Sequence, residues 1–508
     1  IVIVIFLILT ERQHRWWQSL LFAGVMIVML RTNETGFWSP YYHITIRRYD
    51  IPADAGQREN AATNIYSRAL PLVTKPENNI RTINNPPVYI VNVNQDFYQP
   101  HMTINPLRYT NPLSKDFVRS TSYKYDFPYL VSAHRKKVAV LGAGGGTDVE
   151  AALLNGAEHV DAVEIDPMLV KLSHQFNPSG VYDDPRVTVH TDDARAFLRR
   201  ALEKYDIIVF GWLDSQALFS HMSNIRLDGY IYTAESIRSA FNLLNEQGWL
   251  AISFVAGADW LSHKLFAMVK EGTGQTPYVY AHEGSILLAV ARGQHSPPPP
   301  AIGDFIRIEP SPAKLQAAKS VVPTDDWPYL YLSRRTIPSD YLFVITLLLL
   351  VSVTSVLTLR SERFGSYGWH FLFLGVGFLL LETSAITNCC LYFGSTWLVT
   401  MIVVAGVLLM VLAANYIAGA LKKVNAWLYL LLLASLLPVY LVPQDAVLMM
   451  SFWQRVSWVL LIVPLPVFFA GLIFSVTFRD SSAPAFSLGA NLVGAMIGGF
   501  SEYLGMAI

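Results

Sequence analysis

The stretch that decides the fold runs from Val138 to Pro167 and reads VAVLGAGGGTDVEAALLNGAEHVDAVEIDP. An apolar run typical of a buried strand leads into a glycine-rich loop, and a helical pattern begins directly after it. The next predicted strand ends at Glu164, where a carboxylate can accept two hydrogen bonds from a ribose diol. A tight strand-to-helix turn would explain the loop alone, but the loop and Glu164 together predict a nucleotide-binding α/β unit.

Four glycines form the loop: Gly142, Gly144, Gly145 and Gly146. Because glycine has no side chain, the backbone at these positions can approach a ligand closely. We expect all four to contribute to binding a small-molecule nucleoside.

Strands and helices alternate along the chain on both sides of this loop. The segments KVAVL, VDAVEI, VTVH, IIVF and LAISF between residues 137 and 254 are predicted strands, and a helical pattern follows each of the first four. Such alternation is typical of a parallel sheet with helices on both faces. We therefore expect a Rossmann-like domain at residues 131–335, preceded by a small β-rich domain at residues 36–130.

Two adjacent acids, Asp192 and Asp193, follow the third predicted strand. One of them could accept the amino hydrogen of an adenine. Adenosine held by an acid after strand two and another after strand three is the pattern of the class I methyltransferase-like fold, which binds S-adenosylmethionine. A dinucleotide is the alternative, but its third fingerprint glycine would fall at Thr147. The pattern favours S-adenosylmethionine or its decarboxylated form, and it predicts no metal.

Several motifs resemble the spermidine synthase family, and most closely its bacterial members that are fused to membrane helices. They are the glycine loop, VEIDP, DDARAFL, YDIIV, YTAES, SPYYHITI near the N-terminus, and TDDWPYLY at residues 324–331. In that family the glycine loop and the carboxylates that match Glu164 and Asp193 hold the nucleoside. The resemblance, which spans residues 36–335, implies a transferase that uses decarboxylated S-adenosylmethionine or S-adenosylmethionine, with an amine or an unknown group as acceptor.

One motif departs from the family pattern. A spermidine synthase needs carboxylates to bind its diamine and accept a proton, and two of them lie in a D-x-x-D motif after strand four. Here the segment reads YDIIVFGWLDSQ, so the first position is Gly211 and the second is Asp214. Asp214 is therefore the best acid–base candidate. The acid of the family's glycine loop is replaced by Gly145, although the neighbouring Asp148 could take its place.

Three functions stay open at this point. The first is aminopropyl transfer, and the second is methyl transfer, which can proceed by positioning without a base. The third is a catalytically inactive scaffold or subunit of a larger membrane complex.

Long apolar runs indicate that part of the chain lies in a lipid bilayer. Residues 1–31 contain one or two predicted membrane helices, and residues 340–508 contain about six runs of roughly 20 residues each, the length that crosses the hydrocarbon. We therefore expect a multi-pass α-helical membrane protein with an inserted α/β domain, in the bacterial cytoplasmic membrane, with lipid and other membrane proteins as partners. The formal net charge of +0 argues against a nucleic-acid partner.

Two arguments disagree about which side of the membrane carries the α/β domain. With the spans counted as above, the opposite face carries most of the basic residues in short loops: Arg12, Arg15, Arg360, Arg363, Lys422, Lys423 and Arg479. The positive-inside rule would place that opposite face in the cytoplasm. S-adenosylmethionine, however, is a cytoplasmic metabolite, so both orientations stay open.

Overall fold

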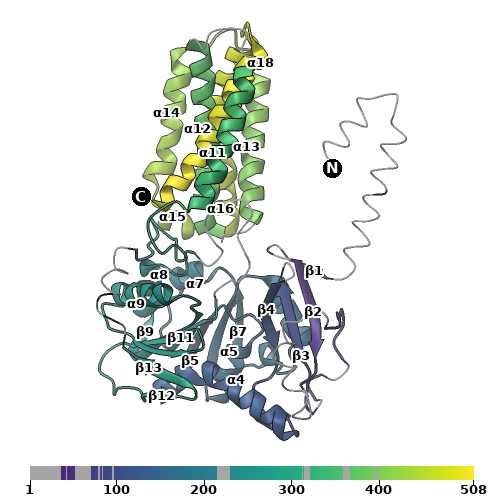
Figure 1. Ribbon diagram of the computed structural model, residues 1–508, viewed down its shortest axis with the longest axis vertical. Coiled ribbons are helices and arrows are strands. Elements are labelled where there is room, and N and C mark those ends of the chain that lie inside the picture. Colours follow the sequence, from purple (N-terminus) through teal and green to yellow (C-terminus); the bar gives the residue numbers. More distant parts are fainter. Residues whose placement is uncertain are drawn as a thin grey trace.

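The computed structural model describes residues 36–51, 70–93, 96–213, 229–309, 321–358, 366–393 and 397–507, apart from a few single positions in the first two ranges. The predicted membrane helices at residues 1–31, Gly24 excepted, and the predicted acid–base residue Asp214 lie outside these ranges. Figure 1 shows a helical bundle above a larger α/β part, with a small sheet at one side of the α/β part.

The small sheet is antiparallel and has four strands in the order β1-β2-β3-β4. Its strands are β1 (Phe37–Trp38), β2 (His43–Tyr49), β3 (Val88–Val93) and β4 (Asp96–His101). Buried side chains of β2 and β3, such as Ile44 and Val91, pack on Leu169 and Phe176 of helix α6. The small sheet thus packs on α6, and Gln99 and His101 of β4 lie against the glycine loop.

A short 3-10 turn, η3 (Pro106–Arg108), and a long helix, α4 (Pro112–Val131), follow the small sheet. The Asn111 side chain caps α4 by accepting a hydrogen bond from the backbone N–H of Leu113 at 2.8 Å. The last part of the segment expected to be β-rich, from Pro106 on, is therefore helical, and α4 becomes one wall of the site described below.

The larger sheet has nine strands in the order β12-β13-β10-β11-β9-β8-β5-β6-β7. Its strands are β5 (Lys137–Leu141), β6 (His159–Glu164), β7 (Val187–Thr191), β8 (Tyr205–Gly211), β9 (Leu244–Val255), β10 (Tyr278–His282), β11 (Ser285–Ala291), β12 (Ala301–Ile302) and β13 (Phe305–Ile308). Only β5 to β9 are parallel to one another. The prediction of a parallel sheet was thus wrong for one half, because β10 to β13 return as antiparallel hairpins along one side.

Helices α5 (Thr147–Leu154), α6 (Pro167–Phe176), α7 (Ala194–Arg200), α8 (Ala234–Asn242) and α9 (Asp259–Thr273) and the short η4 (Val181–Asp183) accompany these strands. The central strands are buried and rich in Val and Ile, as expected when helices cover both faces. Strand β5 pairs with β6 on one side and with β8 on the other. Chain order therefore reverses at β5, and ligands of such sheets bind outside the carboxyl ends of the strands at this reversal.

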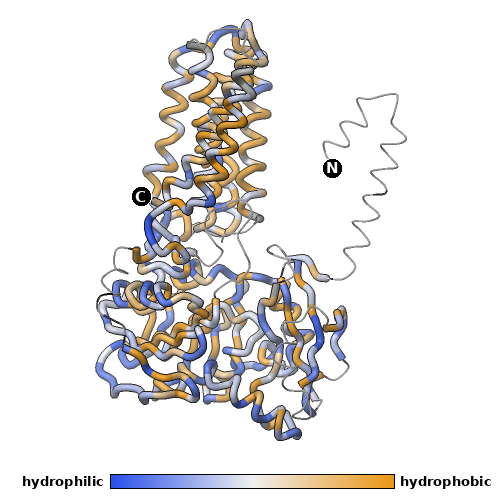
Figure 2. The backbone as a smooth tube through the Cα atoms, viewed as in Figure 1, coloured by the Kyte–Doolittle hydropathy of each residue, from blue (hydrophilic) through white to orange (hydrophobic). Residues whose placement is uncertain are grey.

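The bundle consists of α11 (Ser339–Thr358), α12 (Ser366–Phe393), α13 (Trp397–Ala418), α14 (Ala426–Leu441), α15 (Gln444–Leu448), α16 (Phe452–Ser457), η5 (Trp458–Ile462), α17 (Leu465–Arg479), α18 (Pro484–Ser501) and η6 (Glu502–Met506). Within the described residues, three helical stretches are long and apolar enough to span a membrane: Gly368–Cys390, Val399–Ala418 and Phe452–Arg479. Figure 2 shows hydrophobic residues along the whole bundle.

Helices α12 and α18 pack at very short range through glycines. A Cβ atom added at Gly494 would overlap the backbone carbonyl of Leu372, and one added at Gly498 would overlap that of Val376. Gly377, also in α12, has no atom within 4 Å of such a Cβ. The small residues therefore permit close helix contact at defined positions only.

The TDDWPYLY segment joins the α/β domain to the bundle. Trp327 donates its indole hydrogen to the carbonyl of Met506 at 3.2 Å. Lys264, which is fully buried, donates to the carbonyls of Tyr329 at 2.7 Å and Leu332 at 2.8 Å. Asp325 accepts a hydrogen bond from the buried Arg195 of α7 at 2.6 Å. The segment thus ties α7 and α9 to the end of the bundle.

Candidate nucleoside site

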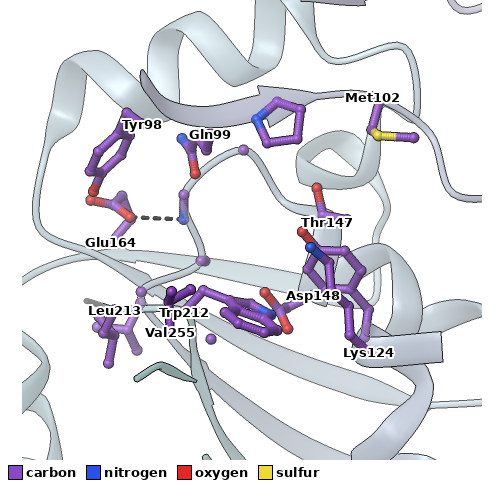
Figure 3. Close-up of a pocket in the computed structure, with 18 of the residues that line it drawn as sticks. Tyr98, Gln99, Met102, Lys124, Thr147, Asp148, Glu164, Trp212, Leu213 and Val255 are labelled. Atoms are coloured by element: carbon purple, nitrogen blue, oxygen red, sulfur yellow. Dashed lines mark hydrogen bonds between the residues drawn. The ribbon is translucent and has the colours of Figure 1, made fainter. Parts of the chain in front are cut away.

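A cavity of about 520 Å³ lies at the carboxyl edge of the parallel strands. Its walls come from the glycine loop after β5, the ends of β6, β7 and β8, strand β4 of the small sheet, and helix α4. Figure 3 shows Glu164 on one side of the glycine loop, and Asp148, Trp212 and Lys124 gathered on the other. The cavity therefore has two ends with different side chains.

The glycine loop contributes bare backbone to the cavity. Gly142 and Gly144 have φ angles of 73° and 48°, a region that glycine adopts without strain. A Cβ at Gly142 would collide with Leu213, and one at Gly145 would lie 2.6 Å from His101. All three line the cavity. Gly146 caps α5 and faces Val181, so it shapes the loop without reaching the cavity wall.

Hydrogen bonds from outside the cavity hold this loop in place. The carbonyl of Gly144 accepts from the Tyr182 hydroxyl at 2.7 Å and from the Ser173 hydroxyl at 3.1 Å. The Asn177 side chain donates to the carbonyl of Gly145. The protein's own side chains thus hold the loop in its conformation.

Glu164 is buried at the end of β6 and lines the cavity. Its two oxygens accept the backbone N–H groups of Gly144 at 2.8 Å and of Asp166 at 3.0 Å. A carboxylate has about four lone-pair positions, so these two hydrogen bonds do not use all of its acceptor capacity. Burial raises the pKa of Glu164 to about 7. The Tyr98 hydroxyl points toward this carboxylate (Figure 3).

Asp192 and Asp193 follow β7 and both line the cavity. Asp192 is next to Glu164 in space, since its backbone N–H donates to the Glu164 carbonyl at 3.0 Å. Its side chain pairs with Arg200. The Asp193 side chain caps α7 by accepting from the N–H of Ala196 at 2.9 Å, and burial raises its pKa. Each carboxylate keeps acceptor positions that an adenine amino group could use.

The other end of the cavity is built around Asp148. A Cβ added at Gly211 would lie 2.9 Å from Oδ2 and 3.1 Å from Cγ of Asp148. The Asp148 carboxylate therefore occupies the space that a side chain at position 211 would need. Burial raises the pKa of Asp148 to about 7, although the charge of Lys124 acts against this rise.

Lys124 reaches this end of the cavity from α4. Its Nζ lies 4.9 Å from the ring centre of Trp212 and 5.2 Å from that of Tyr125. Trp212 has a φ of 51°, which is unusual for a residue with a side chain, and its ring packs edge-to-face with that of Tyr125, with the ring centres 6.4 Å apart. Lys124 is the only cationic side chain among the described residues that line the cavity.

The sequence did not predict the contributions of Gln99, Lys124 and Trp212. Gln99 lies over Gly144 from β4, and Lys124 comes from α4, so both belong to segments that precede the Rossmann-like domain. Nothing near Lys124 in the sequence marks it as a site residue. Trp212 had a usable signal, because it follows directly on the end of a parallel strand, where ligands bind.

Comparison with known proteins identifies relatives of the domain. Residues 121–282 match the family model of the spermine/spermidine synthase domain. A polyamine aminopropyltransferase from Pectobacterium carotovorum subsp. carotovorum (strain PC1) is 37% identical over 86 residues, which cover 16% of this chain and 30% of that protein. Another, from Streptococcus pneumoniae serotype 4 (strain ATCC BAA-334 / TIGR4), is 33% identical over 124 residues, 24% of this chain and 40% of that protein.

Among solved structures, spermidine synthase from Thermotoga maritima aligns over 40% of this chain and 66% of its own, with 14% identity and a TM-score of 0.30. At that score the structural likeness supports no inference of its own.

Fold and cavity together define a Rossmann-like α/β domain with an open site at the carboxyl edge of its sheet. Within that class, residues 121–282 are similar to the spermine/spermidine synthase domain, which confirms the resemblance for this domain. The matches span 30% and 40% of the two relatives, so the likeness is that of the domain.

Proposed function

We propose that this chain is a membrane-anchored transferase that binds decarboxylated S-adenosylmethionine or S-adenosylmethionine as its substrate. One observation carries the proposal: the glycine loop, Glu164, Asp192 and Asp193 line a single cavity of about 520 Å³ at the strand reversal. Bare loop backbone suits a nucleoside sugar, and the carboxylates suit hydrogen-bond donors. A ribose diol and an adenine amino group present donors of this kind.

In this proposal the ribose hydroxyls donate to Glu164, and the adenine amino group donates to Asp192 or Asp193. The sulfonium then lies toward the glycine loop and the end that contains Asp148. An acceptor amine attacks the methylene carbon next to the sulfur. The C–N bond forms as the C–S bond breaks, the electron pair moves to sulfur, and methylthioadenosine leaves. The new ammonium group loses its proton to a carboxylate.

Two carboxylates are candidates for that proton transfer. Asp214 is the sequence candidate and lies outside the described residues. Asp148 lines the cavity, and its pKa of about 7 suits exchange of a proton near neutral pH.

Membrane anchoring is supported by the three helical stretches that are long and apolar enough to span a bilayer. Large apolar side chains on the outside of the bundle are exposed, including Phe343, Leu412 and Trp427 at 70%, 68% and 73%. Such a surface is costly in water and suits lipid. The transferase proposal also requires the α/β domain to face the cytoplasm, which labelling of the domain from that side tests.

The proposal is tested by calorimetry on the purified full chain in detergent with methylthioadenosine, S-adenosylmethionine and decarboxylated S-adenosylmethionine. We expect methylthioadenosine and at least one of the sulfonium nucleosides to bind. Binding of none of the three to a chain that still unfolds cooperatively would exclude a transferase and leave a membrane scaffold.

Methyl transfer is the second candidate, because Gly211 lacks the first acid that a diamine site needs. The released nucleoside separates the two reactions. Aminopropyl transfer releases methylthioadenosine, whereas methyl transfer releases S-adenosylhomocysteine, and chromatography of the reaction mixture tells them apart.

A further inference from the structure

The acceptor end of the cavity carries charges of both signs. The Asp148 carboxylate occupies the space beside Gly211, where the family pattern has its first acid. Lys124 lines the same end of the cavity, where its Nζ lies 4.9 Å from the ring centre of Trp212, and its charge opposes the rise in the pKa of Asp148. A lysine at this position would repel a diamine, because a diamine carries two positive charges.

Trp212 adds an unused hydrogen-bond donor at the same place. Its indole nitrogen Nε1 is buried, and no acceptor among the described residues is within hydrogen-bond distance. The same ring lies 4.9 Å from Nζ of Lys124. A buried N–H without a partner is unfavourable, so an acceptor atom from a ligand would satisfy it. A cation and an unsatisfied donor side by side suit an anionic group.

We infer that the acceptor is a zwitterion, an amine that also carries a carboxylate or similar anion, and that it binds with its ammonium group at Asp148 and its anion at Lys124 and Trp212. This inference rests on the proposed transferase function and names its acceptor class. A diamine in the same place would bring its second positive charge against Lys124. Repulsion between like charges that are partly removed from water is strong enough to decide between two otherwise matched ligands.

The test compares pairs of ligands of equal chain length. Linear diamines of three to six carbons and the corresponding ω-amino acids are titrated into the full chain in detergent, with methylthioadenosine present at saturation. We expect the amino acid of the best pair to bind at least about tenfold more tightly than its diamine. A tighter diamine, or no binding of either series while methylthioadenosine binds, overturns the inference. If methylthioadenosine itself does not bind, the proposed function fails instead.

The variant Lys124→Glu tests the assigned residue. It should reverse the preference, so that the diamine binds more tightly than the amino acid. Unchanged binding of methylthioadenosine shows that the site of this variant is still folded. Lys115→Glu is the matched control, because Lys115 lies on the same helix and does not line the cavity. It should keep the preference of the unchanged protein. An unaltered preference in Lys124→Glu rules out the role of this lysine.

Discussion

Replacing Glu164 by glutamine removes one carboxylate oxygen without changing the size of the side chain, so it tests the ribose end of the cavity. In the folded protein the two oxygens of Glu164 already accept the N–H groups of Gly144 and Asp166. The remaining acceptor capacity of the carboxylate is available to the hydroxyls of a ribose. The amide retains only one oxygen and brings two donors of its own.

The expected loss follows from these contacts. A hydrogen bond to an ionised group contributes about 1.5–3 kcal/mol, and glutamine weakens one or both of the bonds to the ribose. We expect methylthioadenosine to bind with an affinity lower by about 2–4 kcal/mol, which is roughly 30- to 1000-fold. Methylthioadenosine is the right probe because its sulfur carries no charge, so attraction between a sulfonium and the carboxylates does not enter.

The pH dependence of methylthioadenosine binding tests the role of Glu164 in a second, independent way. The pKa of Glu164 is about 7, so the carboxylate is mostly ionised at pH 8 and mostly protonated at pH 6. Since the ionised form accepts both hydroxyls, affinity in the unchanged protein should fall by about tenfold from pH 8 to pH 6. Most of this fall should be missing in Glu164→Gln.

Calorimetry at both pH values measures these effects, with thermal unfolding to verify that the variant is folded. Glu158→Gln is the control, because Glu158 is an exposed acid that pairs with Lys136 on the surface. It should bind like the unchanged protein. Equal affinity in Glu164→Gln and the unchanged protein would refute the assignment of Glu164 to the ribose.

Three further substitutions test other parts of the structure. Gly142→Ala places a side chain at a residue with a positive φ and against Leu213, so it should lower the free energy of unfolding by about 2–5 kcal/mol in chemical denaturation. An unchanged denaturation midpoint would contradict this close approach of Leu213. Lys264→Met removes the ammonium group that donates to the carbonyls of Tyr329 and Leu332, which costs about 1–3 kcal/mol, and should lower Tm; a Tm equal to that of the unchanged protein would contradict these two hydrogen bonds. Gly494→Ala should lower the thermal stability of the bundle in detergent, whereas Gly377→Ala should not, because only the first position contacts a neighbouring helix; equal effects would contradict the packing of α12 on α18.

Much of the large sheet could be predicted because its central strands leave a strong local signal. Strands β5, β6, β8 and β9 contain apolar runs, β7 alternates between Val and polar residues, and turn or helix-capping residues follow the first four strands. The strand at Ser285–Ala291 was predicted, but its antiparallel pairing was missed, although the hairpin between β10 and β11 had a recognisable turn at Glu283 and Gly284. Both residues have positive φ angles of 43° and 79°, which is typical of a two-residue hairpin turn.

Helix α4 was not predicted because its sequence, PLSKDFVRSTSYKYDFPYLV, is mostly polar and contains Pro128. Such a helix has little apolar periodicity of its own and depends on tertiary packing, here through side chains such as Val118 and Tyr129. Local sequence patterns do not contain this information.

The nucleoside end of the site was easier to predict than the acceptor end. Glu164, Asp192 and Asp193 each follow a parallel strand, and the ends of neighbouring parallel strands meet at one edge. Lys124 is 24 residues before Asp148 in the chain and reaches it only because α4 folds back along the sheet. A contact of this kind depends on the folded structure, so no spacing rule finds it.

The most direct measurement is an experimental structure of the full chain with methylthioadenosine, determined by electron cryomicroscopy in a lipid nanodisc. The account predicts the nucleoside in the cavity at the end of β5, with both ribose hydroxyls on Glu164 and the adenine amino group at Asp192 or Asp193. A nucleoside bound elsewhere, or a cavity that stays empty at saturating ligand, would contradict it.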